Sequence, residues 1–305
     1  DMWFRNLHLY RLPEPFTLGP EDLAAQLSAR TFRPCGSIEA FSLGWVPPLG
    51  DPQASLVHAA NGCLMMCARR QEKLLPAAVV NEELAERLEE IEAREGRRVG
   101  GKERQRLRDE VLQDFLPRAF TRSQRLFAYL DPAQQWLIVD AATSKKAEDL
   151  ISFLRETLGT LPAKPLSVKH RPAQVMTGWV QSGQPPGDLQ LLDECELRDP
   201  EEKGGIVRCR RQDLSGEEVG THLEAGKQVT KLALEWEEHL SCLLDDELGI
   251  KRLRFSDLIL EEAGQVDSED QAARFDADFA LMSLELRRFL TLLLESFGGS
   301  ESESV

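Results

Sequence analysis

The order of apolar and polar residues along the chain follows two periods, which predict both strands and helices. Short apolar and aromatic runs bounded by turn residues predict strands. On this basis we expect strands at 3–12, 44–48, 57–59, 64–68, 126–130, 136–139, 206–210, 229–236, 240–244 and 253–255. Apolar residues spaced by three and four predict helices at 20–30, at 78–98, in a stretch ending before Pro117, at 144–158, after Ser215, and from 268 to 297.

Two neighbouring predicted helices carry only thin apolar stripes. Gly100-Gly101 separates them, and Pro117 stops the second one. Because such helices can bury little surface, we expect an antiparallel pair that projects from the body as an arm at about 76–117. The stripe residues are Val80, Leu84, Leu88 and Ile91 on the first helix and Leu107, Val111, Leu112 and Phe115 on the second.

The last predicted helix has a stronger stripe. Ser268-Glu269-Asp270-Gln271 fits a capping box at its start, and Gly298-Gly299 ends it. We interpret the stripe as core or interface, and we expect residues 299–305 to be a disordered tail. The stripe consists of Phe275, Phe279, Met282, Leu286, Phe289 and Leu293.

The order of these elements indicates an α+β fold with mixed antiparallel sheets, because runs of strands are interrupted by helices without a regular βαβ alternation. Pro162 and Pro165 mark a connector. We therefore expect an N-terminal half at 1–165, which includes the arm, and a C-terminal half at 166–298. Both halves contain two strands followed by a helix, which hints at internal pseudosymmetry.

Charge is distributed unevenly along the chain. The whole protein is acidic, with 37 Lys and Arg against 52 Asp and Glu and a net charge of −15. In contrast, the segment from Arg94 to Arg125 contains ten basic residues and five acidic ones. One interpretation is a positive field focused on a polyanion that the acidic remainder repels. The other is a solvated helical face with paired charges.

Several classes of function find no support in the sequence. No uncharged apolar run approaches the roughly 18 residues of a membrane span, and the N-terminus has no apolar signal-peptide stretch. We therefore expect a cytoplasmic protein without membrane contact. Gly220 to Lys227 has five residues between its glycines where a Walker loop has four, and Gln228 replaces the Ser or Thr that binds the metal.

The sequence also lacks a recognisable pattern for a metal site or a catalytic site. Cys63 and Cys67 share one face of a predicted strand, but no His lies at ligand spacing, so we expect buried free thiols. Glu201-Glu202-Lys203 has the E-x-K ending of one nuclease class, without the upstream Pro-Asp pair, and is better explained as a turn. The five histidines are scattered and pair with no recognisable nucleophile. We expect no cofactor and no metal.

Several longer motifs, in register over nearly the whole chain, resemble those of the RdgC family of bacterial recombination-associated DNA-binding proteins. The motifs are Trp3-Phe4 with Tyr10-Arg11-Leu12, Gly44-Trp45-Val46-Pro47-Pro48, Leu116 to Phe120, Lys145 to Asp149, Glu224 to Lys227, Val229 to Leu234, and Arg274 to Phe279. The resemblance implies a ring-shaped homodimer with a positively charged hole that encircles DNA. It further implies binding of single- and double-stranded DNA with little sequence preference, restraint of RecA action, and location in the cytoplasm at the nucleoid. It implies neither cofactor nor catalysis.

The same resemblance points to individual residues. Arg118 and Phe120 match family positions tied to DNA binding and ring function, and Arg211 and Gln212 match another such pair, in which the family can have Lys at position 211. For Phe120 three interpretations stay open: a buried anchor, an interface wedge, and a platform for an unpaired base. Further candidates for phosphate contact are the basic residues Arg97, Arg98, Lys102, Arg122, Arg210 and Lys227.

Our leading hypothesis is a non-enzymatic ring dimer that binds DNA and restrains RecA-dependent recombination. A Mg²⁺-dependent DNA-processing enzyme and an acidic scaffold for protein partners remain the alternatives.

Overall fold

Two long strands form the centre of the N-terminal part of the structure. The computed structural model describes residues 2–265 and 269–301, and in it β4 (Cys63–Leu74) pairs antiparallel with β5 (Phe120–Asp131) over their full length. Asn61 and Gly62, with φ of 52° and 72°, form the tight turn that joins β3 to β4. The predicted hairpin at this turn is therefore confirmed.

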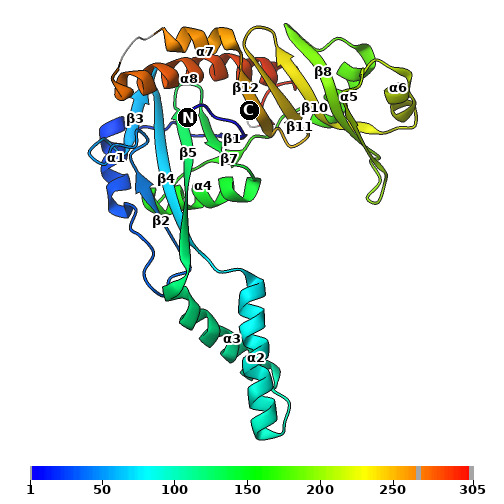
Figure 1. Cartoon of the computed structure of the whole chain (residues 1–305). Coiled ribbons are helices and arrows are strands. Elements are labelled where there is room, and N and C mark those ends of the chain that lie inside the picture. The colour runs from blue at the N-terminus through cyan, green and yellow to red at the C-terminus, as the bar shows by residue number, and fades with distance from the viewer. Residues whose placement is uncertain (1, 266–268, 302–305) are drawn as a thin grey trace.

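A single antiparallel sheet runs through both parts of the described chain (Figure 1). Its strand order is β2-β4-β5-β6-β1-β12-β11-β10-β8-β9, with β3 paired to β4 and β7 paired to β1. The sheet joins N-terminal to C-terminal strands where β1 meets β12. The other strands are β1 (Leu7–Arg11), β2 (Phe41–Val46), β3 (Val57–Ala60), β6 (Trp136–Asp140), β7 (Lys164–Pro165), β8 (Leu189–Arg198), β9 (Ile206–Arg210), β10 (Gln228–Trp236), β11 (Leu240–Asp245) and β12 (Ile250–Phe255).

Helices accompany this sheet, so the α+β class is confirmed. The helices are α1 (Pro20–Leu27), α2 (Ala77–Glu95), α3 (Gly101–Phe115), α4 (Ser144–Leu158), α5 (Pro172–Ser182), α6 (Glu217–Glu224), α7 (Asp257–Gly264) and α8 (Gln271–Ser296), with 3₁₀ turns η1 (Ser28–Arg30) and η2 (Leu116–Arg118). The sequence pattern had not indicated α5, α7 or β8. The pattern also predicts that β5 begins at Leu126, six residues later than it does in the structure.

The alternation of side chains along β4 and β5 supplies two separate cores. Cys63, Met65 and Tyr129 lie on one face and join the core that includes α8, whereas Leu64 and Leu130 lie on the other face and join the core that includes α4. Cys63 and Cys67 are buried free thiols, as expected. Burial raises the pKa of the Cys63 thiol to about 11 and that of Cys67 to about 12.

Helix α8 packs across the N-terminal strands. The Phe279 ring lies 5.4 Å from the Tyr129 ring, and Arg287 Nε donates to Asp131 Oδ2 at 2.9 Å. Of the predicted stripe, Phe279, Met282, Leu286, Phe289 and Leu293 are buried, so the stripe belongs to the core.

The two ends of α8 differ from the sequence expectation. Ser268 of the predicted capping box lies outside the described residues, and Asp270 caps the helix by accepting from the Ala272 amide. Beyond the helix, Ser300 is buried and bridges to Val168, so the fold continues to at least Ser300, into the expected tail. Residues 302–305 lie outside the described part. The described helices include none whose length and apolarity would suffice to span a bilayer.

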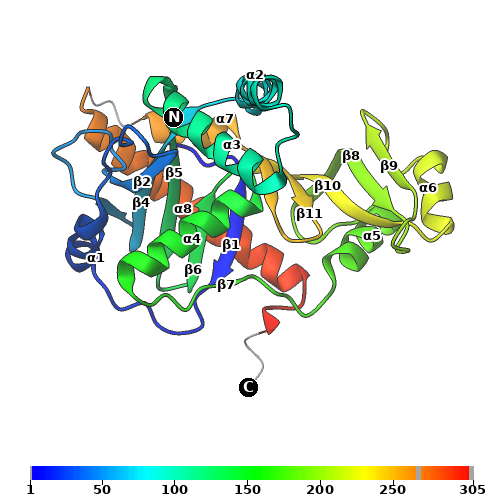
Figure 2. The same ribbon diagram turned by 90° about the horizontal axis from the view of Figure 1, so that it is seen from below.

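Helices α2 and α3 form an antiparallel hairpin that leaves the ends of β4 and β5 and extends away from the sheet (Figures 1 and 2). We call it the α2–α3 hairpin. Val80, Leu84 and Val111 are buried between the helices, as the thin stripes predicted. Arg87 on α2 donates to Asp114 on α3 at 2.9 Å, which adds a polar link between the helices.

Candidate nucleic-acid interface

The turn of the α2–α3 hairpin contains three of the predicted basic residues. Arg97 donates from both terminal nitrogens to the Glu103 carboxylate at 2.8 and 2.9 Å, and its Nε donates to Glu95 at 2.6 Å. These hydrogen bonds raise the pKa of Arg97 above its usual value. The positive charge of Arg97 is thus neutralised by Glu95 and Glu103, and these ion pairs link the two helices. Its predicted role in phosphate contact is not supported by this geometry.

Arg98 and Lys102 differ from Arg97. Both side chains are exposed, and neither contacts a carboxylate among the residues that the structure describes. They can therefore meet an anion without first breaking an ion pair.

A second group lies where the hairpin joins the sheet. Arg118 in η2 is exposed and its guanidinium lies 5.4 Å from the centre of the Phe115 ring. Arg122 on β5 lies directly opposite Glu72 on β4 and donates to it at 2.5 Å. Arg118 is therefore free of a carboxylate within the described chain, whereas Arg122 is neutralised by its cross-strand neighbour.

Phe120 begins β5 with a side chain that is 83% exposed. The interpretation of Phe120 as a buried anchor of the isolated chain is therefore wrong. Leu74, 43% exposed, lies directly opposite it, and Phe41, 50% exposed, lies on the same face of the neighbouring strand β2. We call Phe41, Leu74 and Phe120 the apolar edge patch. Its exposed apolar side chains suit both an interface wedge and a base platform.

The long β4–β5 pair also creates a basic pair that sequence reasoning missed. Arg69 lies directly opposite Arg125, so the two strands present like charges side by side. Arg69 donates to Ser123 at 3.0 Å and lies 4.6 Å from the Phe32 ring centre, while Arg125 is exposed. Like charges in this position destabilise a sheet. An anion bound between them would remove that cost.

A third group lies at the end of β9. Cys209 is buried while Arg208 and Arg210 are exposed, because successive side chains of a strand point to opposite faces. Arg211 follows with a left-handed φ of 54°, and the amide of Gln212 donates to the carbonyl of Asp193 at 3.2 Å. The side chains of Arg211 and Gln212 are exposed and have no hydrogen-bond partner in the described chain.

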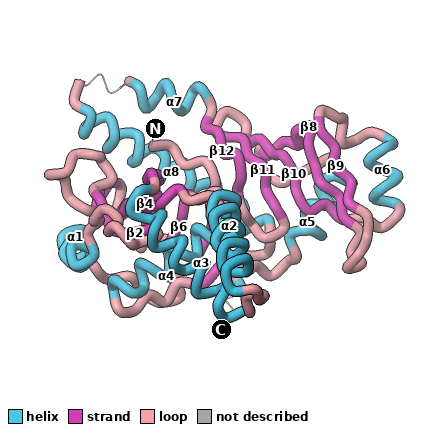
Figure 3. Tube along the Cα trace, turned by 60° about the horizontal axis from the view of Figure 1, so that its bottom comes forward, coloured by secondary structure: helices cyan, strands magenta, loops and turns pink. Residues whose placement is uncertain are grey.

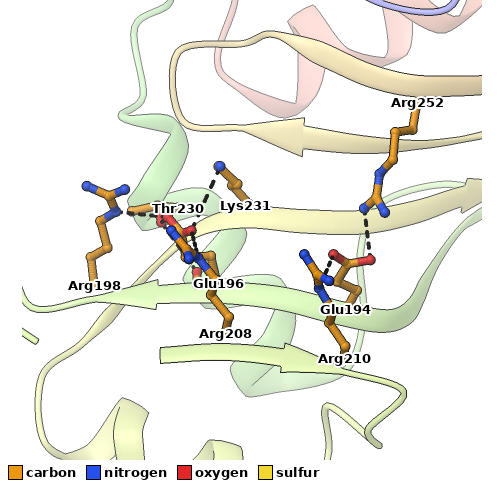
Figure 4. Close-up of polar contacts among 8 residues, drawn as sticks. All are labelled: Glu194, Glu196, Arg198, Arg208, Arg210, Thr230, Lys231 and Arg252. Carbon is orange, nitrogen blue, oxygen red and sulfur yellow. Dashed lines mark hydrogen bonds and ion pairs between the residues drawn. The ribbon is translucent and has the colours of Figure 1, made fainter. Parts of the chain in front are cut away.

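The neighbouring strands supply a cluster of cations around two carboxylates (Figure 4). Glu194 on β8 accepts from Arg252 on β12 at 2.8 Å and lies 3.5 Å from Nε of Arg210. Glu196, two residues further along β8, contacts three further cations, Arg198, Arg208 and Lys231. Sequence reasoning missed this cluster because its charges are brought together by the pairing of β8 with β9 and β10 and by the approach of Arg252 from β12.

The remaining candidates have simpler surroundings. Lys227 is half-buried in the turn between α6 and β10, and its amide donates to the His222 carbonyl at 3.1 Å. Gly220 to Glu224 lie within α6, so this segment forms a helix end and no phosphate loop. Glu201 to Lys203 form the turn between β8 and β9, as expected. Within residues 2–265 and 269–301, no group of three or more His, Cys, Asp or Glu side chains is arranged to hold a metal ion.

The predicted site residues thus fall into three groups rather than one. The turn of the α2–α3 hairpin lies far from the sheet. The residues from Arg118 to Arg122 lie where this hairpin joins the sheet, and β9 lies at the other end of the molecule, away from that junction (Figures 1 and 3). A ligand that contacted all three would have to be long.

Comparison with known proteins finds similarity along nearly the whole chain. The family model described as "Putative exonuclease, RdgC" matches residues 2–300. Proteins named Recombination-associated protein RdgC are similar over nearly their whole length: that of Aeromonas hydrophila is 48% identical, covering 98% of this chain and 99% of the relative. That of Tolumonas auensis is 46% identical, with coverage of 99% and 100%, and that of Pseudomonas aeruginosa is 48% identical, with coverage of 98% for both chains. This chain therefore belongs to the RdgC family.

Proposed function

We propose that this protein binds single- and double-stranded DNA without sequence preference, as a homodimeric ring that encircles the DNA. By occupying DNA it restrains RecA-dependent recombination, and it works in the cytoplasm at the nucleoid. The names of its relatives, which are recombination-associated proteins, support a role on DNA.

The observation that carries the DNA-binding part is the exposed basic surface of an acidic chain. Arg69 and Arg125 lie directly opposite each other, neither paired with a carboxylate of the described chain, and Arg118 is exposed at the base of the α2–α3 hairpin. A chain with a net charge of −15 repels a polyanion elsewhere on its surface. Because phosphate contacts give affinity without reading bases, sequence preference should be weak.

The outline of the molecule supports a ring. The α2–α3 hairpin extends in one direction from the body and the β8–β9 end extends in another, which leaves an open corner between them (Figure 1). A second copy related by a two-fold axis would close this corner. In this proposal the halves 1–165 and 166–298 both line the hole, and the apolar edge patch of Phe41, Leu74 and Phe120 is buried between the copies.

The proposal is tested with the full chain and plasmid DNA. We expect it to bind supercoiled plasmid and linear fragments of unrelated sequence with similar affinity, and to leave the plasmid uncut in the presence of Mg²⁺. Nicking or shortening of the DNA would instead support an exonuclease, which the description of the matching family favours. Absence of binding would leave the acidic protein scaffold.

A further inference from the structure

Glu196 occupies an unusual position for a charged residue. Its side chain is only 4% exposed, on β8, and it is surrounded by basic side chains (Figure 4). Arg198 donates to one of its oxygens at 2.8 Å and Arg208 to the other at 3.0 Å, while Thr230 donates at 3.1 Å. Lys231 Nζ lies 3.8 Å away. One buried carboxylate thus holds two guanidinium groups and one ammonium group.

The atoms used in these bonds determine what the arginines can still do. Both Arg198 and Arg208 bond Glu196 through Nε, the inner nitrogen of the guanidinium group. Their terminal nitrogens form no hydrogen bond to the described chain, and the side chains are 48% and 65% exposed. The terminal pair of nitrogens is the planar fork that matches the geometry of a phosphate. Two such forks are therefore fixed at their base and open to solvent.

The charge of Glu196 is stable in this setting. Burial alone would raise its pKa, but the hydrogen bonds from Arg198 and Arg208 and the charge of Lys231 outweigh burial and lower the pKa to about 2. The carboxylate is therefore ionised at neutral pH. With three cations around one anion, the cluster keeps a positive excess.

We infer that Arg198 and Arg208 form a phosphate clamp on the face of β8, β9 and β10, in which Glu196 is the positioning residue. The ligand is a phosphate of the DNA backbone, so the inference rests on the proposed function and adds a site to it. Two residues away along β8, Glu194 lies 3.5 Å from Nε of Arg210 and accepts from a terminal nitrogen of Arg252, so only Arg210 there faces a carboxylate through its inner nitrogen. Two residues span about 7 Å along a strand. Binding at the clamp should be insensitive to base sequence.

Substitution of the carboxylate separates positioning from simple electrostatics. Glu196→Gln removes a negative charge beside the ligand, so long-range electrostatics alone would make DNA binding tighter. If Glu196 positions the forks, the same substitution frees two arginine side chains and binding becomes weaker, despite the added positive charge. The sign of the change is therefore diagnostic.

The experiment measures the affinity of the full-length protein for a fluorescent DNA duplex at fixed salt. We expect Glu196→Gln to weaken binding by about fivefold or more. Glu202→Gln is the matched control, because it removes the same charge from an exposed residue in the turn between β8 and β9. It should leave affinity unchanged or slightly higher. Arg208→Lys retains the charge but loses the fork, so it should weaken binding as well.

The outcomes distinguish this inference from the function on which it rests. If the unaltered protein does not bind the duplex, the proposed function fails and the clamp with it. If the unaltered protein binds but Glu196→Gln and Arg208→Lys bind equally well or better, the clamp is wrong and the function stands. Should Glu196→Gln fail to fold, which its melting curve would reveal, Arg208→Lys decides alone, since Arg208 is exposed.

Discussion

Leu74 and Phe120 lie directly opposite each other at the ends of β4 and β5, and both apolar side chains are exposed in the single chain. An isolated exposed apolar residue is common, but here an exposed cross-strand pair lies on the same face as the exposed Phe41 of the neighbouring strand. In the proposed dimer this edge is covered by the second copy.

Phe120→Ala should therefore weaken dimerisation and leave the folding of the single chain almost unchanged. Because Phe120 is 83% exposed, we expect its removal to change the free energy of unfolding of the monomer by no more than about 0.5 kcal/mol. Light scattering at micromolar concentration should find the unaltered protein at twice 34.3 kDa and the variant shifted toward 34.3 kDa. Leu258→Ala, at a residue 56% exposed on α7, is the control. A variant as dimeric as the control would remove the edge from the interface.

Arg118→Ala and Arg211→Ala should weaken binding to unrelated DNA sequences about equally. Both side chains are exposed, and each is expected to contact a phosphate. Each substitution should lower the slope of log affinity against log salt by about one unit per lost contact per subunit. Melting temperatures should hardly change. Variants that lose stability but retain DNA affinity would refute the assignment.

Arg97→Ala should give the opposite pattern. Since Arg97 bonds Glu95 and Glu103 across the turn between α2 and α3, its removal should loosen this turn and change the salt slope little. Hydrogen exchange of the turn, compared between this variant and Arg98→Ala, measures the difference. If the amides of the turn are equally protected in the two variants, and Arg97→Ala strongly lowers the slope of log affinity against log salt, the prediction that Arg97 contacts a phosphate would be right after all.

Arg125→Ala should stabilise the free protein and weaken its complex with DNA. The substitution removes a like charge directly opposite Arg69, a relief of about 0.2–1 kcal/mol. Denaturant unfolding without DNA measures the first effect and a binding titration the second. Loss of stability in the free protein would show that the pair is not repulsive there.

The lowered pKa of Glu196 predicts how the stability of the fold depends on pH. Its pKa is lowered from 4.5 to about 2, since the hydrogen bonds from Arg198 and Arg208 outweigh the effect of burial. The folded state therefore binds its proton less readily than the unfolded state, and the resulting stabilisation is present above pH 4.5 and lost as the pH falls toward 2. Denaturant unfolding at a series of pH values should show that the free energies of unfolding of the protein and of Glu196→Gln converge as the pH falls from 4.5 toward 2. A constant difference between them would contradict the ion-pair cluster.

Much of the fold could be predicted from local patterns. Asn61-Gly62 specified a hairpin, and Gly159 ends α4 in the left-handed conformation with φ of 79°. Strand β8 was missed because Glu194 and Glu196 interrupt its apolar pattern, and most of the cations that compensate these charges lie on other strands. The first part of β5 was missed for a related reason: residues 120–125 are exposed on both faces, so no apolar alternation marks them.

The candidate site was less predictable than the fold. A sequence gives the number of basic residues, but their pairing depends on three-dimensional contacts. Arg97 and Arg98 are neighbours in sequence, yet of the two only Arg97 is bound to carboxylates of the described chain. Arg69 lies outside the basic segment and meets Arg125 only through the register of β4 and β5.

The most direct test of the central claim is the affinity of the unaltered protein for a DNA duplex, measured as a function of salt concentration. If exposed arginines and lysines bind phosphates, log affinity falls linearly with log salt, with a slope that reflects several released counterions and is the same for unrelated sequences. An affinity that stays flat from low to physiological salt would contradict the claim.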